Sequence, residues 1–304
     1  MDKFSVFSSR LVDKSENFTS GHRACQGCAE ALAVRHVMKA LGRDTIVAMA
    51  TGCMEIISSP LPLTSWKVPW IHNAFENPSA VISGCESGMK AMMRKGKIPQ
   101  KKINFVAMGG DGATADIGMG PLSGALERGH DMVYVCYDNE AYMNTGVQRS
   151  SSTPWGASTM TTPGASWKRT QKKNIVEIMA AHRIPYTATA NIAFPEDLER
   201  KLRKARSIRS GLRFIHLFAS CPTGWGFAPA DAIKISRMAV LSRAFPLYEV
   251  EEGERYTINS GGDAPVYDYL RMQNRFRRLS DGDIAMIQEH VNREWERLNR
   301  KARG

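Results

Sequence analysis

Residues 103–112 read Ile-Asn-Phe-Val-Ala-Met-Gly-Gly-Asp-Gly, and residues 132–139 read Met-Val-Tyr-Val-Cys-Tyr-Asp-Asn. Each stretch begins with an apolar run of the length of a buried strand and ends in polar residues. Between them, Gly120 and Pro121 predict the start of a helix and Gly129 its end. Strand, helix and strand in this order predict a right-handed crossover, with both polar ends at the carboxyl edge of a parallel sheet.

The polar residues at this edge are of the kind that binds a metal and a phosphate. Asp111 supplies a carboxylate and Asn139 an amide oxygen, and Mg²⁺ prefers such ligands together with the phosphates of a substrate or cofactor. Gly110 and Gly112 let backbone N–H groups approach a diphosphate closely. The pattern therefore predicts a magnesium–diphosphate site. The alternative is an Asp-Gly turn in an α/β protein that binds no ligand.

Four of the six cysteines are predicted at the same edge of the sheet. Two precede a helix predicted over 29–41, one follows a strand at 45–50, and one follows an apolar run at 214–219. The four are Cys25, Cys28, Cys53 and Cys221. Four thiolates suit either zinc or an iron–sulfur cluster, and the helix dipole is expected to stabilise the first two. Cys85 and Cys136 fall inside a predicted helix and strand and are interpreted as small buried residues.

Together these motifs resemble the thiamine diphosphate-binding β subunit of the 2-oxoacid:ferredoxin oxidoreductases, and they are most similar to the pyruvate (pyruvate synthase) branch. The motifs are Cys25-Gln-Gly-Cys28-Ala-Glu30, Thr51-Gly52-Cys53, the stretches 110–118 and 138–146, and Ser220-Cys221-Pro222. The likeness covers roughly residues 21–226. It implies an α/β fold in which helices flank a mostly parallel sheet, the fold of the diphosphate-binding half of such enzymes, followed by a C-terminal helical arm.

The resemblance also implies roles for individual residues. Cys25, Cys28, Cys53 and Cys221 would bind one 4Fe–4S cluster beside the thiamine diphosphate. Asp111, the Asn139 side chain and the Ala141 carbonyl would ligate Mg²⁺; many relatives carry Thr at position 139, which also offers one neutral oxygen. The expected cofactor-binding residues are Glu30, Thr51, Gly52, Cys53, Gly110, Asp111, Gly112, Ala113, Asn139, Ala141, Tyr142, Asn144 and Thr145. The activating glutamate is expected on a partner subunit, so no catalytic residue is assigned to this chain.

The activity implied by the resemblance is CoA-dependent oxidative decarboxylation of a 2-oxoacid, pyruvate above all, with electrons passing through the cluster to ferredoxin. The implied partners are a pyrimidine-binding α-type subunit, a γ-type subunit and a ferredoxin-like δ-type subunit. An aryl or branched substrate such as phenylglyoxylate is the first alternative. More distant alternatives are a non-redox thiamine diphosphate lyase subunit with structural zinc and a non-catalytic, zinc-bound interaction module.

The composition of the chain narrows the remaining classes of function. The 304 residues carry a net charge of +11, but no nucleic-acid-binding motif accompanies it. The charge is expected either to be balanced by acidic partner subunits or to steer an acidic electron carrier. No run of 18 apolar residues predicts membrane insertion, and the absence of a secretory signal predicts a cytoplasmic protein in which thiols stay reduced.

We predict three regions: an N-terminal arm (1–20), a thiamine diphosphate and iron–sulfur-binding α/β domain (21–250), and a C-terminal basic arm with a helix (251–304). Residues 146–170 are rich in Gly, Ser, Thr and Pro, and are expected to cover the cofactor or meet another subunit. A helix predicted over 281–300 carries an apolar stripe expected to pack against a partner subunit. The stripe consists of Ile284, Ile287, Val291, Trp295 and Leu298.

Overall fold

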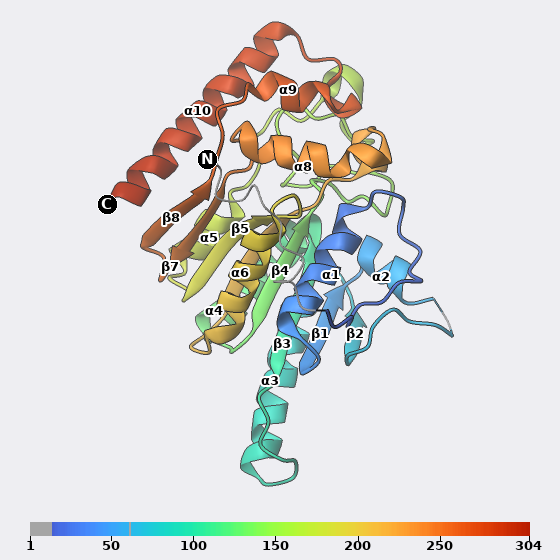
Figure 1. Cartoon of the computed structure of the whole chain (residues 1–304), viewed down its shortest axis with the longest axis vertical. Helices are drawn as coiled ribbons and strands as arrows, with labels where there is room; N and C mark the ends of the chain where they lie inside the picture. Colours follow the sequence, from blue (N-terminus) through green and yellow to red (C-terminus); the bar gives the residue numbers. More distant parts are fainter. Residues whose placement is uncertain (1–13, 61) are drawn as a thin grey trace.

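The computed structural model describes residues 14–60 and 62–304, which form an eight-stranded sheet with helices on both faces (Figure 1). The strands lie in the order β2 (Trp70–Asn73), β1 (Thr45–Ala50), β3 (Asn104–Gly110), β4 (Val133–Asp138), β6 (Arg213–Phe218), β5 (Tyr186–Asn191), β7 (Leu247–Glu251) and β8 (Arg255–Ser260). The first six are parallel, and β7 and β8 extend the sheet as an antiparallel hairpin. The mostly parallel α/β fold predicted from sequence is confirmed.

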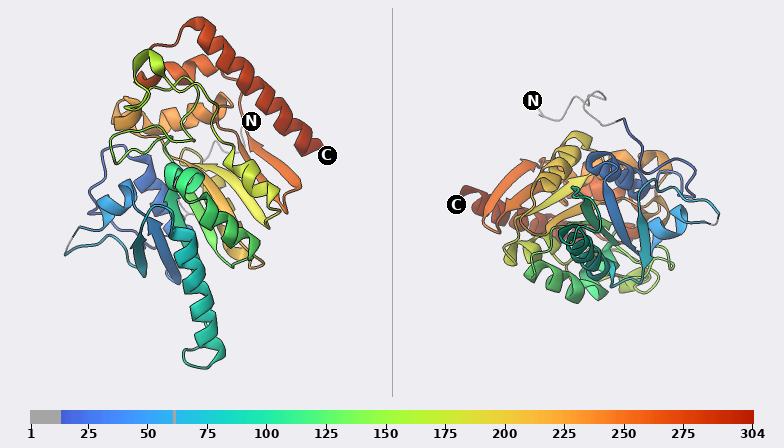
Figure 2. Two further views of the ribbon diagram at one scale, coloured as in Figure 1. Left: turned by 180° about the vertical axis from the view of Figure 1, so that it is seen from behind. Right: turned by 90° about the horizontal axis from the view of Figure 1, so that it is seen from below.

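Helices cover the two faces as right-handed crossovers require. Helices α1 (Ala29–Leu41) and α6 (Pro195–Ser207) pack together on one face, and α3 (Pro78–Arg94), α4 (Met119–Glu127) and α5 (Ile175–Ala181) lie on the other, as Figure 2 shows from behind. The remaining helices are the short α2 (Cys53–Ser58) and α7 (Pro222–Trp225), followed by α8 (Ala232–Leu241), α9 (Val266–Arg271) and α10 (Asp281–Arg303). Two apolar cores therefore sandwich the sheet.

The predicted elements around the motifs form with small shifts. The helix over 29–41 and the strand over 45–50 have the predicted bounds, and Gly42 ends the helix at φ +80°. Helix α4 begins at Met119, two residues before Pro121, because the preceding five residues close a π-helical turn that the sequence did not predict. Cys136 is buried in β4, as interpreted, whereas Cys85 lies in α3 against the apolar core but is only partly buried.

The expectation that the apolar stripe of the C-terminal helix packs against a partner subunit is wrong. Ile284, Val291 and Leu298 of α10 are buried within this chain, and Trp295 packs beside them. The physical reason is that β8 and α9, which the sequence did not reveal as elements, supply the apolar surface that α10 covers.

The division of the chain at residue 250 stays a prediction. The structure shows that β8, which follows this point, pairs with β7, which precedes it. Most of the predicted N-terminal arm lies outside the described residues; within residues 14–20, Phe18 is buried against Trp66. None of the helices in residues 14–60 and 62–304 is long and apolar enough to cross a membrane.

Candidate functional site

The carboxyl ends of β1, β3 and β4 meet around one pocket. All of the residues predicted to bind the cofactor line it, together with Phe75, Tyr137 and Met143. They are Glu30, Thr51, Gly52, Cys53, Gly110, Asp111, Gly112, Ala113, Asn139, Ala141, Tyr142, Asn144 and Thr145. They converge because parallel strands with right-handed crossovers release their following loops at the same edge.

Asp111 lines this pocket as a buried side chain, 1% exposed. Its Oδ2 accepts a hydrogen bond of 2.5 Å from the Ser150 hydroxyl, and no Lys, Arg or His within residues 14–60 and 62–304 forms an ion pair with it. Burial, reinforced by the nearby charge of Asp138, raises the pKa of Asp111 well above its usual range. A buried carboxylate without an ion-pair partner is costly, so a bound cation would stabilise the charged form of Asp111.

Asn139 and Ala141 line the same pocket. The Asn139 Oδ1 accepts the Ala141 N–H at 3.3 Å, and its amide nitrogen donates to Glu30 Oε1. Burial raises the pKa of Glu30 to about 8, although the hydrogen bond from Asn139 works in the opposite direction. The bond also fixes the amide, which turns the oxygen of Asn139 away from Glu30. The structure therefore brings Asp111 and Asn139 to one pocket, and their role as metal ligands stays a prediction.

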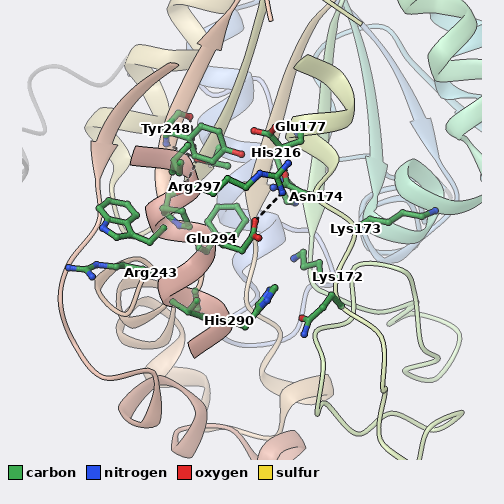
Figure 3. A pocket seen from close by; sticks show the side chains of 18 of the residues that line it. Lys172, Lys173, Asn174, Glu177, His216, Arg243, Tyr248, His290, Glu294 and Arg297 are labelled. Atoms are coloured by element: carbon green, nitrogen blue, oxygen red, sulfur yellow. Dashed lines mark hydrogen bonds and ion pairs between the residues drawn. The ribbon is translucent and has the colours of Figure 1, made fainter. Parts of the chain in front are cut away.

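A buried ionic network supports the loop that carries Asn139. Asp138 is fully buried, and its Oδ2 contacts Lys172 Nζ at 2.5 Å and His216 Nε2 at 2.7 Å. Burial alone raises the pKa of Asp138, but Lys172 and His216 outweigh it and hold the pKa well below its usual range. Figure 3 shows Lys172 and His216 beside a second cavity of about 350 Å³, which residues of α10 also line. The network fixes the start of the loop, since Asp138 also accepts the Glu140 N–H.

Gly112 provides a close approach between the two loops. A Cβ at this position would overlap the ring of Tyr142, with its Cδ1 at 2.7 Å, and Tyr142 donates to the Gly112 carbonyl at 3.2 Å. The chain then enters the π-helical turn Ala113–Ile117, a rare conformation that occurs mostly at functional sites. Gly110 differs, because the nearest atom to its Cβ position is Tyr137 Cε2 at an ordinary 3.6 Å.

Substitution of these two glycines is expected to separate folding from cofactor binding. Gly112→Ala should lower the free energy of unfolding by about 1–3 kcal/mol, because the methyl group must displace Tyr142. Gly110→Ala should leave stability nearly unchanged but reduce thiamine diphosphate affinity, since its Cβ would enter the pocket. Denaturant unfolding and isothermal titration of both variants measure the two effects. Equal stability of the two variants would contradict the assignment of Gly112 to loop packing.

The four predicted cysteines lie around the same edge. Cys53 begins α2 after β1, Cys221 follows β6, and Cys25 and Cys28 precede α1. Cys221 Sγ accepts the Gly224 N–H at 3.3 Å, and Thr223 of the same turn contacts Cys25 Sγ at 4.0 Å. Gly27, at φ +71°, passes so close to Pro229 that a Cβ would lie 2.8 Å from its Cα. The turns that carry Cys25 and Cys221 are thus packed together.

The thiols of this group act on one another electrostatically. Burial, with a smaller contribution from Glu30, raises the pKa of Cys28 to about 12 and that of Cys221 to about 11. Burial raises the pKa of Cys53 above its usual range, and the other three cysteines add to this effect. The N–H groups of Glu30 and Ala31 at the start of α1 lower the pKa of Cys28, in the direction expected of the helix dipole, but burial outweighs them. Within residues 14–60 and 62–304, no three His, Cys, Asp or Glu side chains are grouped to hold a single metal ion.

Comparison with known proteins identifies the family. The profile of the thiamine pyrophosphate enzymes, C-terminal TPP binding domain, matches residues 50–217; thiamine pyrophosphate is another name for thiamine diphosphate. Pyruvate synthase subunit PorB of Methanocaldococcus jannaschii is 53% identical over 290 residues, which cover 94% of this chain and 97% of that protein. The chain belongs to the PorB/VorB family of 2-oxoacid oxidoreductase subunits.

Relatives named for ketoisovalerate are almost as similar to the chain as those named for pyruvate. Ketoisovalerate oxidoreductase subunit VorB of Pyrococcus horikoshii is 50% identical over 295 residues, which cover 94% of each chain. Among solved structures, a 2-oxoglutarate:ferredoxin oxidoreductase from Magnetococcus marinus shares the fold, with a TM-score of 0.57 and 20% identity over 75% of this chain and 82% of that one. The sequence-based recognition of the family is confirmed.

Several residues that support the site in this PorB/VorB-type chain were not found from sequence. Arg275, near the C-terminus, donates to Glu140 Oε2 at 2.6 Å and stacks on Trp225, with its guanidinium carbon 3.7 Å from the ring centroid. Trp225 in turn donates to the Asn139 carbonyl at 2.8 Å. Glu140 has a φ of +66°, so the loop is held in a conformation that non-glycine residues rarely adopt. No local pattern marks a pair separated by 135 positions.

Arg275→Met is expected to weaken thiamine diphosphate binding about 10–100-fold, because partners behind a metal ligand typically contribute that much to affinity. Loss of the guanidinium leaves Glu140 buried with Lys172 alone and frees the loop that carries Asn139. Arg277→Met is the matched control, since Arg277 is exposed two residues away. Titration of both apoproteins with Mg²⁺ and thiamine diphosphate measures the two affinities. Equal affinities in the two variants would exclude a supporting role for Arg275.

Proposed function

We propose that this chain binds thiamine diphosphate through Mg²⁺ held by Asp111, Asn139 and the Ala141 carbonyl. The observation that carries the proposal is the buried Asp111 carboxylate, which has Ser150 as its hydrogen-bond partner and lies in a pocket lined by Gly110 and Gly112. A divalent cation would compensate the burial of this charge, and the diphosphate would complete the cation's coordination. The unpartnered hydroxyl of Tyr137, buried in the same pocket, also fits a polar ligand.

We further propose that Cys25, Cys28, Cys53 and Cys221 hold one 4Fe–4S cluster next to this cofactor. Each thiolate of such a cluster binds a different iron, so its four sulfurs surround a larger volume than the ligands of one zinc ion. The mutual electrostatic influence of these thiols supports a shared site, and the lack of a single-ion grouping among the described residues weighs against zinc. Bound iron would favour the thiolates over the thiols and so reverse the effect of burial.

The reaction we propose is the oxidative decarboxylation of pyruvate to acetyl-CoA and CO₂, with electrons leaving through the cluster to ferredoxin. Bound thiamine diphosphate supplies the electron sink for loss of CO₂. The residues of this chain would hold the cofactor at the carboxyl edge of the sheet, next to Glu30, whose pKa burial raises to about 8.

The names of the relatives point to pyruvate and 2-oxoisovalerate as candidate substrates. The PorB relatives, named for pyruvate, and the VorB relatives, named for ketoisovalerate, differ in identity to this chain by only 3 percentage points, 53% against 50%. We propose that the substrate side-chain pocket lies mainly on the pyrimidine-binding α-type subunit, which also supplies the activating glutamate. The γ-type and ferredoxin-like δ-type subunits would complete the complex.

The test compares the intact, anaerobically purified complex with the isolated chain. The complex should form acyl-CoA from pyruvate faster than from 2-oxoisovalerate or phenylglyoxylate, and it should depend on CoA and an electron acceptor. The isolated chain should show iron–sulfur absorbance but no turnover. A colourless isolated chain that contains zinc would contradict the cluster proposal, and preference for 2-oxoisovalerate would contradict the choice of pyruvate.

A further inference from the structure

Helix α3 extends past the body of the molecule. Its first half packs on β1, β3 and α4, whereas its end and the following loop project below the sheet in Figure 1 and again in the view from behind in Figure 2. The last buried residue of α3 is Glu86, and no residue from 90 to 102 is buried. We call residues 90–102 the projecting segment. A helix end that packs on nothing in its own chain gains no tertiary stabilisation there.

The projecting segment is strongly basic. It contains six lysine or arginine residues and no aspartate or glutamate, and these six are Lys90, Arg94, Lys95, Lys97, Lys101 and Lys102. Lys90 pairs with Glu86 and Lys101 with Asp44, which lie outside the segment. The other four have no carboxylate partner within residues 14–60 and 62–304. The segment therefore presents an unbalanced cluster of positive charge.

Apolar side chains accompany the charges. Met92 is 38% exposed, and Met93 and Ile98 are only partly covered and belong to none of the apolar cores. Methionine adapts its shape to irregular surfaces and is common where proteins bind one another. Basic side chains around a small apolar patch form the usual pattern of a docking surface with a polar rim.

The position of the projecting segment separates it from the cofactor site. Helix α3 runs from the carboxyl edge of β2 to the amino end of β3, whereas Asp111 follows the carboxyl end of β3. The segment and the site thus lie at opposite ends of the sheet. This arrangement excludes the segment as a wall of the cofactor pocket and as the exit for electrons from the four cysteines.

We propose that the projecting segment docks into an acidic surface of another subunit of the same complex. The inference rests on the chain being one subunit of an oligomeric enzyme, which its PorB and VorB relatives establish, and not on the cofactor assignments. Charge complementarity argues for this occupant, because four uncompensated cations on a chain of net charge +11 disfavour a second copy of the same segment. The Met92 and Met93 side chains would be buried at the centre of the contact.

A zero-length carbodiimide, which joins lysine amines to carboxylates in direct contact, tests the proposal on the intact complex. Mass spectrometry should find Lys95 or Lys97 joined to an aspartate or glutamate of another subunit. Cross-links from these lysines only to a second copy of this chain, or to no other subunit at all, would overturn it. Before the reaction, the absorbance of the purified complex at 260 nm shows whether nucleic acid is bound, and any nucleic acid is removed. Nucleic acid bound to this segment would likewise overturn the proposal.

A charge-reversed variant gives a second, independent measurement. The triple variant Arg94→Glu, Lys95→Glu, Lys97→Glu should raise the dissociation constant of the complex more than about 10-fold, since like charges would then face each other. The matched control reverses three exposed cations elsewhere, Lys234, Arg293 and Arg300, each to Glu. Native mass spectrometry measures assembly, and thermal unfolding shows that both variants fold. Equal dissociation constants in the two variants would refute the docking role.

Discussion

Asp111→Ala is expected to weaken Mg²⁺–thiamine diphosphate binding more than about 100-fold. Partners behind a metal ligand typically change affinity about 10–100-fold, so loss of a charged ligand should exceed this range. The variant should also fold at least as well as the parent without cofactor, because it removes a buried carboxylate that forms no ion pair with the described residues. Higher stability of the apoprotein combined with lost affinity would be the signature of a metal ligand.

Asn139→Thr is the control for this experiment. It exchanges one neutral oxygen donor for another, so affinity should change less than about 10-fold, whereas Asp111→Ala should weaken binding more than about 100-fold. Isothermal titration of each apoprotein with thiamine diphosphate at saturating Mg²⁺ gives the affinities, and thermal unfolding without ligands gives the stabilities. Unchanged affinity in the Asp111→Ala protein would rule out the proposed metal site.

Cys53→Ser has the second largest expected effect, the loss of the iron–sulfur cluster from this subunit. A serine hydroxyl is a far weaker ligand for iron than a thiolate, and Cys53 lies between the cofactor pocket and the other three cysteines. The intact complex should therefore lose about four iron atoms per copy of this chain and the matching part of its visible absorbance. Thiamine diphosphate content should fall much less, because Asp111 and Asn139 are unchanged.

Cys85→Ser provides the comparison for the cluster experiment. Cys85 lies in α3, outside the pocket and outside the group of four cysteines, so its replacement should retain iron and absorbance. Anaerobic iron and sulfide analysis measures the cluster content of both variants. A Cys53→Ser complex with full iron content, or a Cys85→Ser complex that loses it, would show that the four cysteines were assigned wrongly.

The sequence alone determined which residues would share one edge of the sheet. Gly110 to Gly112, Asn139 and the four cysteines each follow or adjoin an apolar run, and the fixed hand of strand–helix–strand crossovers sends all such loops to the carboxyl edge. Local patterns also gave α1 and β1 with their observed bounds, since capping glycines and continuous apolar runs act within a few residues. Interactions between residues that are close in the sequence are enough to predict these features.

Only the tertiary structure decided which groups support that edge. The strand order places β6 beside β4, so His216 meets Asp138, and the irregular segment after Gly146 brings Ser150 to Asp111. Arg275 reaches Glu140 from the C-terminal region, and α10 covers its own chain rather than a partner. These contacts join residues 39 to 135 positions apart. Their partners are chosen by packing and charge compensation in the folded chain, which leave no local mark in the sequence.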